Sequence, residues 1–275
     1  MDMNIRPAHI IQVVFLLSLM SSCDQPEKQW QFERKIMLPE EARPLALAKD
    51  GDAIWFSDPD YFRLYKIDRD GELLDSITGI QRPMNIHTDN GTLFIPEFLT
   101  DTIWQYRDDK RWPLKLSKRP QAPAGVSIYG DTVLVADFYN HRIIVQTPNE
   151  CFTIGRQGHK DGELYYPIDV KMKDNRIYVA DAYNSRIQVF GFNGTHLKTI
   201  GGNEKMNVAS GIAMGEREFA ITDQENGRVL IYNFDGSLRQ VLTESIKYPT
   251  DVQFDGEYLY STNFKENAIL IWSRK

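Results

Sequence analysis

The sequence has no basic block, only two cysteines, and no long helical periodicity beyond its first twenty residues. Without a clustered Lys and Arg face, nucleic acid is disfavoured as a partner, and so is a surface held to anionic lipid by charge alone. Hydrophobic residues make up 42% of the chain, which is ample for a buried core, and the formal net charge is −6. We therefore expect a folded β-domain that does not bind nucleic acid.

The sequence also lacks the common short motifs of catalysis. It contains no Gly-x-Ser-x-Gly, His-Glu-x-x-His, Walker or Cys-x-x-Cys motif. On this basis we predict no catalytic residue, no metal site and no cofactor.

What the chain does have is a five-residue spacing between an Asp and an Arg. Each Asp ends a short apolar run and each Arg opens another, in the pairs Asp58 and Arg63, Asp137 and Arg142, Asp181 and Arg186, and Asp223 and Arg228. Two further units keep the pattern but carry Glu97 and Thr102, or Asn263 and Ala268, at these places. Since Asp and Arg are kept together or lost together, we expect the side chains of each pair to touch and to serve the structure.

The six marker positions, 58, 97, 137, 181, 223 and 263, follow one another at intervals of 39, 40, 44, 42 and 40 residues. A period near forty with short β-runs is typical of a β-propeller, with one four-stranded antiparallel blade per repeat. In the clearest repeat we expect strands at 168–172, 176–180, 186–190 and 196–200. The sequence therefore predicts an all-β fold, a six-bladed propeller at residues 30–275.

The last repeat ends with the apolar run Ile269–Trp272 and has no fourth strand after it. The run Phe32–Met37 precedes the first repeat and supplies a spare strand. Pairing the two would close the ring and remove an open sheet edge, which otherwise invites aggregation. We therefore expect the N-terminal strand to complete the last blade.

The segment Tyr178–Phe190 resembles the core of an NHL repeat, as does Asn140–Ile143 in the preceding repeat. The glycine-rich stretch at 155–167 is similar to the link between blades in that family. The resemblance is strongest from Pro123 to Tyr232 and implies a six-bladed propeller of the NHL type. Because propellers host unrelated activities, it implies a fold and no particular function.

The N-terminus differs from the repeats. Arg6 precedes the apolar stretch Ile10–Met20, which is too short to span a bilayer and is followed by two serines and Cys23. This pattern resembles a bacterial lipobox, so we expect a signal peptide at 1–22, lipid attachment at Cys23 and a polar tether at 23–29. A plain secretory signal that is cleaved near the same place is the alternative.

Lipid attachment at Cys23 would leave Cys151 without an intramolecular partner, so we expect no disulfide. Cys151 falls in the expected fourth strand of the third repeat, where a packed, inert thiol is the simplest interpretation. The lipid would hold the protein outside the cytoplasm on a bacterial membrane, which could be the inner or the outer one.

The peptidyl-hydroxyglycine amidating lyases, which have NHL-type propellers, bind zinc through histidines at the starts of their inner strands. The equivalent places here hold no imidazole: they are Leu45, Met84, Ala124, Ile168, Ser210 and Thr250. The histidines beyond the leader, His87, His141, His159 and His196, fall at four different places within their repeats. A catalytic zinc needs three protein ligands that converge, so the pattern does not support this lyase activity.

Aromatic residues gather in the loops between the second and third strands of the repeats, on one face of the expected ring. The candidate ligand-binding residues among them are Tyr61, Phe98, Phe138, Tyr183 and Phe264. Loops concentrate binding residues, and exposed aromatic side chains are common anchors in recognition. Several of these rings could instead fill gaps between blades.

Polar residues at the starts of three inner strands form a second set of candidates. Asn85, Asp169 and Asp251 each follow the repeat's proline position by two residues and could face the channel mouth. The alternative is that each side chain bonds the backbone where its strand begins.

Together these features predict a lipid-anchored, extracytoplasmic propeller that binds a protein partner or a small ligand on its loop face. A propeller lyase or hydrolase with an unrecognised channel site is one alternative, and a structural subunit of an envelope complex is another. Channel carboxylates with strongly perturbed pKa values would favour an enzyme, and an apolar surface on the loop face would favour a partner.

Overall fold

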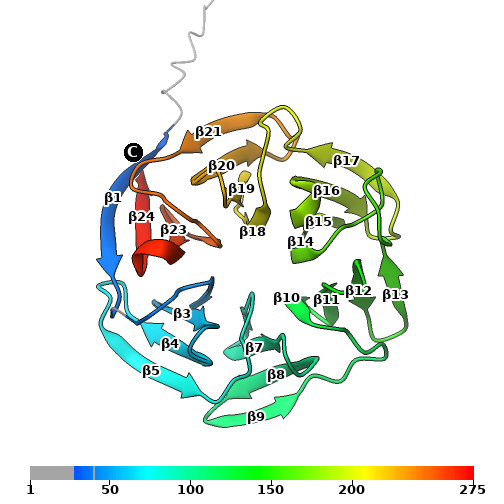
Figure 1. Cartoon of the computed structure of the whole chain (residues 1–275), viewed down its shortest axis with the longest axis horizontal. Helices are drawn as coiled ribbons and strands as arrows, with labels where there is room; N and C mark the ends of the chain where they lie inside the picture. The colour runs from blue at the N-terminus through cyan, green and yellow to red at the C-terminus, as the bar shows by residue number, and fades with distance from the viewer. Residues whose placement is uncertain (1–27, 40) are drawn as a thin grey trace, which may run out of the picture.

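The computed structural model describes residues 28–39 and 41–275, which form six four-stranded antiparallel sheets arranged in a ring (Figure 1). Each sheet is one blade of a β-propeller, and its strands are called a to d from the centre outward. This arrangement confirms the all-β, six-bladed fold that the repeat predicts. Within the described residues, no helix is long and apolar enough to cross a membrane. The predicted signal peptide and Cys23 lie outside the described residues.

The blades follow one another in sequence order. Blade 1 contains β2 (Ala46–Asp50), β3 (Ala53–Asp58), β4 (Arg63–Ile67) and β5 (Leu73–Thr78), and blade 2 contains β6 (His87–Asp89), β7 (Thr92–Glu97), β8 (Thr102–Arg107) and β9 (Lys110–Pro113). Blade 3 contains β10 (Pro123–Tyr129), β11 (Thr132–Asp137), β12 (Arg142–Gln146) and β13 (Cys151–Ile154). Blade 4 contains β14 (Pro167–Lys173), β15 (Arg176–Asp181), β16 (Arg186–Gly191) and β17 (His196–Ile200), and blade 5 contains β18 (Ala209–Met214), β19 (Glu218–Asp223), β20 (Arg228–Asn233) and β21 (Leu238–Leu242). Blade 6 contains β22 (Val252–Asp255), β23 (Tyr258–Asn263), β24 (Ala268–Arg274) and, on its outer edge, β1 (Trp30–Met37).

Strand β1 closes the ring, as the sequence predicts. It pairs antiparallel with β24, beginning with Trp30 opposite Arg274. The Trp30 indole N–H donates to the buried Glu218 carboxylate of blade 5 at 2.7 Å, and the Trp30 backbone exchanges two hydrogen bonds with the Gln240 side chain. The closing strand is therefore attached to two blades, and the sheet edge of β24 is covered.

Apolar side chains from facing sheets fill the space between neighbouring blades. Tyr178 of blade 4 lies against Phe219 of blade 5 with ring centroids 5.3 Å apart, and Phe219 stacks on Tyr232 at 5.5 Å. All three are buried, and each such side chain stabilises the fold by about 2 kcal/mol. Because every blade shares its core with the next, the ring is a firm support for its loops.

The loop between strands b and c has the same backbone turn in all six blades. Its last residue adopts a left-handed φ of 52° to 62°, at Phe62, Asp101, His141, Ser185, Gly227 and Asn267. Only one of the six is glycine, although this conformation costs other residues about 1–2 kcal/mol. The turn sets the marker residue at the end of strand b directly opposite the residue five positions later at the start of strand c. In blades 4 and 6 this loop also contains a single turn of 3₁₀-helix, η1 (Ala182–Asn184) and η2 (Phe264–Glu266).

Candidate functional site

The four Asp and Arg pairs meet at the face of the ring that carries the b–c loops. In each pair the Arg Nε lies close to the Asp Oδ2, at 2.9 Å for Asp58 and Arg63, 2.7 Å for Asp137 and Arg142, 2.8 Å for Asp181 and Arg186, and 2.6 Å for Asp223 and Arg228. The carboxylates are fully buried, whereas the guanidinium groups are partly exposed. The structure thus brings both members of every pair together.

The marker carboxylate also holds the link that enters its blade. Asp137, Asp181 and Asp223 each accept a hydrogen bond at Oδ1 from the backbone N–H of the residue sixteen positions earlier, at 2.7 Å. Glu97 and Asn263, which replace Asp in the other repeats, keep this bond at 2.8 and 3.0 Å. The bond needs only an acceptor, so Glu and Asn can make it where no Arg is present.

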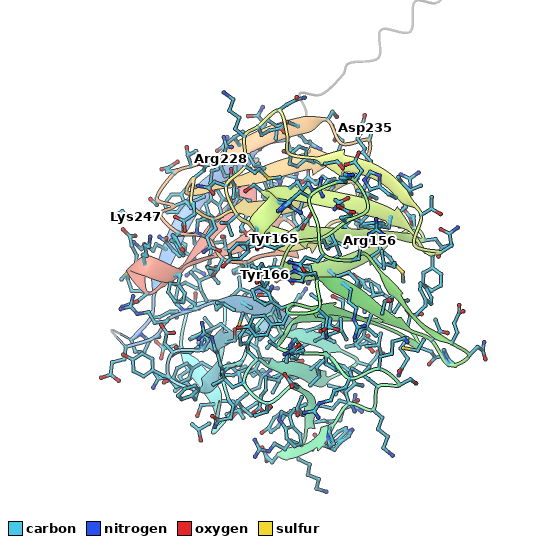
Figure 2. All side chains as sticks on the ribbon, turned by 45° about the vertical axis from the view of Figure 1, so that its right-hand side comes forward. Arg156, Tyr165, Tyr166, Arg228, Asp235 and Lys247 are labelled. Carbon is cyan, nitrogen blue, oxygen red and sulfur yellow. The ribbon has the colours of Figure 1, made fainter. Side chains whose placement is uncertain are left out.

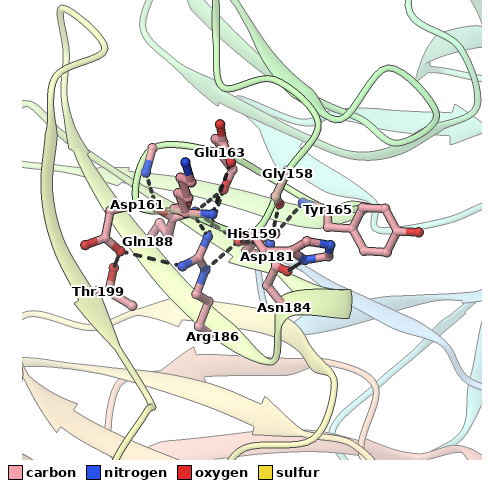
Figure 3. Close-up of polar contacts among 12 residues, drawn as sticks. Gly158, His159, Asp161, Glu163, Tyr165, Asp181, Asn184, Arg186, Gln188 and Thr199 are labelled. Atoms are coloured by element: carbon pink, nitrogen blue, oxygen red, sulfur yellow. Dashed lines mark hydrogen bonds and ion pairs between the residues drawn. The ribbon is translucent and has the colours of Figure 1, made fainter.

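Asp181 shows how far this network reaches (Figure 3). Its Oδ2 accepts hydrogen bonds from Asn184 Nδ2 at 2.9 Å, Arg186 Nε at 2.8 Å and Gln188 Nε2 at 2.9 Å. Arg186 Nη2 donates onward to two backbone oxygens of the link between blades 3 and 4, at 2.7 and 2.9 Å. One buried carboxylate therefore joins the loop, two strands and the link, and holds this part of the face in place.

The structure places the five aromatic candidates in two environments on this face. Tyr61 and Tyr183 are exposed, with 45% and 58% of their surface accessible, whereas Phe98, Phe138 and Phe264 are half-buried. Exposed rings can contact a partner directly, and half-buried rings support them from below.

Phe98, Phe138 and Tyr183 belong to one continuous cluster that crosses blades 2 to 4. Phe138 lies at its centre, with its ring centroid 5.4 Å from that of Phe98, 4.7 Å from Tyr166 and 6.3 Å from Tyr183. Tyr139, 49% exposed, lies 5.2 Å from Phe138. We call Phe98, Phe138, Tyr139, Tyr166 and Tyr183 the aromatic surface.

Tyr61 and Phe264 lie outside the aromatic surface. The Tyr61 ring lies under the guanidinium of Arg63, 4.6 Å from its carbon, and Phe264 contacts Tyr248 with ring centroids 6.2 Å apart. In the described part of the chain, neither ring contacts the aromatic surface. The candidate set drawn from the sequence therefore divides into one cluster and two separate rings.

Tyr165 and Tyr166, in the link before blade 4, were not among the sequence candidates. Figure 2 labels the two tyrosines, whose ring centroids are 4.7 Å apart. The backbone N–H of Tyr166 donates to His141 Nδ1 at 3.1 Å, and the His141 ring stacks on Tyr165 at 5.2 Å. Burial lowers the pKa of His141, and the negative charge of Asp181 opposes this effect without cancelling it. The lowered pKa favours the neutral ring, whose Nδ1 can accept this hydrogen bond. The available signal was the adjacent pair of tyrosines directly before the proline of the fourth repeat.

Asn85, Asp169 and Asp251 are buried where the inner strands begin. Asp169 Oδ2 accepts a backbone N–H of β18 in blade 5 at 3.0 Å, and Asp251 Oδ2 accepts one of β2 in blade 1 at 2.7 Å. The Asn85 amide donates to a backbone oxygen just inside β14 at 3.2 Å. These polar atoms bond the backbone of other blades, and they tie the inner strands together.

The three polar residues alternate with small ones around the ring, in the order Ala46, Asn85, Gly125, Asp169, Gly211 and Asp251. A Cβ on Gly125 would lie 2.6 Å from the backbone oxygen of Ile168, and one on Gly211 would lie 2.6 Å from the Cα of Asp251. Each of these glycines is therefore required by the close approach of the next strand. We call these six positions the polar ring.

Lys171 lies in the channel beside the polar ring. Its Nζ is 2.8 Å from Asp169 Oδ1. Burial alone would lower the pKa of Lys171, but Asp169 and Asp251 together raise it. Burial, assisted by the charge of Asp169, raises the pKa of Asp251 to about 7, and burial with the charge of Lys171 lowers the pKa of His87 to about 3. Near neutral pH the channel therefore holds the ion pair of Lys171 with Asp169, the uncharged imidazole of His87 and the partly protonated carboxyl group of Asp251.

Cys151 is a free, half-buried thiol at the start of β13, and it packs against the apolar cluster between blades 2 and 3. Over residues 28–39 and 41–275, no three His, Cys, Asp or Glu side chains lie together in a way that could hold a metal ion.

Residues 164–190 match the family model of the NHL repeat. No curated protein sequence matches the chain. Among solved structures, a streptogramin B lyase superposes with a TM-score of 0.66 at 11% identity, over 90% of this chain and 98% of the other. A catalytically inactive virginiamycin B lyase from Staphylococcus aureus with quinupristin superposes with a TM-score of 0.65 at 14% identity, over 90% and 88%.

The β-propeller domain of Cps50 (Swd1) from Myceliophteria thermophila is also similar, with a TM-score of 0.61 at 11% identity over 84% of this chain and 83% of the other. At these identities the likeness concerns the fold alone, which hosts unrelated activities. The chain is a six-bladed β-propeller, and one segment of it, residues 164–190, matches the NHL repeat.

Proposed function

We propose that this protein is a lipid-anchored, extracytoplasmic propeller that binds a partner protein through its aromatic surface. The observation that carries the proposal is the continuity of that surface, since Phe98, Phe138, Tyr139, Tyr166 and Tyr183 contact one another across three blades. Isolated exposed rings are ordinary on a protein surface, whereas a contiguous group of them marks an interaction site.

The composition of this surface fits a protein interface. Tyr139, Tyr183 and the neighbouring Leu99 are between 49% and 58% exposed, and they surround rings that are already half-buried. Arg82 lies over the Phe98 ring at 5.5 Å. Tyrosine and arginine are enriched among the residues that contribute most to protein binding, and two-χ tyrosines lose little entropy when they are covered.

Hydrogen bonds hold the loops of the aromatic surface in place, which favours binding by a surface that is already formed before the partner arrives. The Asp181 network holds the link and the b–c loop of blade 4, and His141 holds the backbone of Tyr166. A surface whose loops are held before binding loses less conformational entropy on association.

The proposed anchor would keep this surface at a membrane. Residues 23–29 would separate the lipid on Cys23 from β1, and seven extended residues reach roughly 25 Å. A partner on the same membrane, or on the layer next to it, would then be within reach of the aromatic surface.

A lyase or hydrolase in the channel is the second candidate, because the pKa of the channel carboxyl of Asp251 is raised to about 7. Its geometry opposes a catalytic role. Oδ1 accepts the Val252 backbone N–H at 2.8 Å, and Oδ2 accepts the Leu47 backbone N–H at 2.7 Å. Both oxygens are thus engaged by the backbone, so binding through the aromatic surface is the function we favour.

Affinity capture from membranes tests the proposal, with the full anchored protein as bait. The test variant is the double substitution Tyr139→Ser and Tyr183→Ser, which removes two exposed rings and leaves the half-buried rings in place. The matched control is Leu197→Ser on the outer strand β17, because Leu197 is 52% exposed and far from the b–c loops in its blade.

We expect a partner that the wild type and Leu197→Ser recover equally and that the double variant loses. Partners that the double variant retains at the wild-type level would contradict a role for the aromatic surface. Near-ultraviolet circular dichroism of all three proteins checks that the fold is the same.

A further inference from the structure

A cavity of about 270 Å³ lies in the channel, with Lys49, Gly51, His87, Thr88, Lys171 and Gln253 among the residues that line it. Gly51 belongs to the turn between β2 and β3, at the opposite end of these strands from the b–c loops. The cavity is therefore on the other side of the polar ring from the aromatic surface. Nothing in the proposed function uses it.

Three of the lining side chains occupy equivalent places in alternate blades. His87, Lys171 and Gln253 each lie two residues beyond the polar member of the polar ring on the same inner strand. The same place in the other three blades holds a small residue, and these are Ala48, Ser127 and Ala213. Three long polar side chains thus line one cavity, and the small residues between them leave space for a ligand.

These side chains have unused hydrogen-bonding capacity of both kinds. Lys171 Nζ contacts Asp169, and an ammonium group has three N–H donors, so two remain. Gln253 Nε2 donates to the Phe254 backbone at 3.0 Å, which leaves Oε1 as an acceptor. His87 bonds the backbone of Ile128 through one ring nitrogen, and in a neutral imidazole the other nitrogen is an acceptor.

The charges around the cavity select against a charged ligand. Both lysines of the lining are balanced by a carboxylate, Lys171 by Asp169 at 2.8 Å and Lys49 by Asp255, and Asp251 also lines the cavity. An anion would meet these carboxylates, and a cation would meet the ammonium groups of Lys171 and Lys49, each at close range. A neutral ligand with several hydroxyl groups can use the donors and the acceptors without bringing a charge of its own.

We propose that the channel cavity binds a small, uncharged, polyhydroxylated molecule of about the size of a monosaccharide. The volume agrees with this size, since pockets for larger ligands usually occupy about 300–1,000 Å³. Lys171 donates to ligand hydroxyl oxygens, and His87 and Gln253 accept ligand hydroxyl protons. The site does not depend on the proposed function, because it lies on the opposite side of the polar ring.

Isothermal titration calorimetry of the full protein with three matched sugars tests the proposal. The probes are glucose, which is neutral, glucuronate, which carries a carboxylate, and glucosamine, which carries an ammonium group; galactose and myo-inositol extend the neutral set. We expect at least one neutral probe to bind with a Kd below about 1 mM. The two charged probes should bind at least about tenfold more weakly than glucose or not at all.

Gln253→Leu keeps the approximate size of the side chain and removes its acceptor. We expect it to weaken the binding of the neutral probe by about tenfold. Gln253→Asn shortens the amide and should give an intermediate loss, so it serves if Gln253→Leu fails to fold. Tyr183→Ser, on the aromatic surface, should leave sugar binding unchanged. The proposal is overturned if no neutral probe binds at about 10 mM, if a charged probe binds as well as the neutral ones, or if the folded Gln253 variants keep wild-type affinity.

Discussion

Arg186 Nε lies 2.8 Å from Asp181 Oδ2, across the turn that connects strands b and c of blade 4. The contact recurs at the same place in three other blades, and it involves a carboxylate with no solvent exposure. We interpret these pairs as supports of the loop face. Asp137, Asp181 and Asp223 also bond the backbone of the link that enters their blade, and none of the four carboxylates lines the channel cavity.

A double-mutant cycle on Asp181 and Arg186 should show strong coupling. Asp181→Ala leaves four donors without their acceptor, and we expect it to destabilise the protein by about 3 kcal/mol. Arg186→Ala leaves the carboxylate three other donors and should cost about 1–2 kcal/mol. The double variant should cost less than the sum of the two. The measurement is denaturant unfolding, and strict additivity would show that the spacing reflects repeat ancestry alone.

Tyr61→Asn should stabilise blade 1. In blades 3 to 5 an Asn three residues after the marker donates to its carboxylate, whereas blade 1 has Tyr61 at that place. Oδ1 of Asp58 has no hydrogen-bond partner, and burial raises the pKa of Asp58. A new donor to a buried carboxylate is worth about 2 kcal/mol, and loss of the ring over Arg63 costs about 1 kcal/mol.

We therefore expect Tyr61→Asn to raise the unfolding free energy by about 1 kcal/mol and to lower the pKa of Asp58. Tyr61→Ala is the control, because it removes the ring without supplying a donor and should destabilise slightly. Thermal or denaturant unfolding measures the difference. If Asn is no better than Ala at this position, the missing donor does not explain the state of Asp58.

Asp251 should make stability fall as the pH rises. Its pKa is raised from 3.8 to about 7 in the folded protein, so the folded state holds the proton more tightly than the unfolded chain does. The resulting stabilisation is fully present below about pH 4 and is lost as the pH rises through 7. His87 acts in the opposite direction, because its pKa is lowered to about 3 and its contribution is lost as the pH falls below 6.5.

A comparison with Asp251→Asn separates the two effects. The unfolding free energy of the wild type minus that of Asp251→Asn should decrease steadily between about pH 4 and pH 7. Urea unfolding at several pH values measures this difference. Parallel pH curves for the two proteins would mean that the Asp251 carboxyl has an ordinary pKa.

Cys23→Ala should release the protein from the membrane fraction while it is still exported. The expectation follows from the lipobox resemblance of the residues before Cys23. Cys151→Ala is the matched control and should stay with the membrane. An exported Cys23→Ala protein that remains membrane-bound would refute lipid anchoring at this residue.

The fold could be predicted because each blade repeats the same local pattern. The strand expected at 196–200 coincides with β17, and the strand expected at 176–180 differs from β15 by a single residue. Ring closure followed from one missing strand at the C-terminus and one spare strand at the N-terminus. These features depend on the alternation of apolar and polar residues and on the number of strands, and both can be read directly from the sequence.

The aromatic surface could be predicted only in part. Phe98, Phe138 and Tyr183 come from equivalent loops, so the repeat identified them, but Tyr165 and Tyr166 come from a link with no periodicity. Whether a loop ring joins its neighbours also depends on local partners, as Tyr61 shows by lying against Arg63. The contacts of a loop ring depend on packing between segments that are distant in the sequence. A local sequence pattern contains no information on that packing.

The polar residues of the channel were predicted from the sequence only in part. Asn85, Asp169 and Asp251 look the same in the sequence whether they bond the backbone or a ligand, and only the geometry distinguishes the two. His87 and Lys171 lie two residues further along the same strands as Asn85 and Asp169. Their repeat offset was visible in the sequence, and applying it would have identified them.

Site-specific photo-crosslinking in cells is the most direct test of binding through the aromatic surface. A benzophenone amino acid replaces Tyr183 in one protein and the similarly exposed Leu197, on β17, in another. We predict one discrete crosslinked species from position 183 that is absent from position 197 and disappears when Tyr139→Ser is added. No crosslink at 183, or the same species from both positions, would contradict a partner on the aromatic surface.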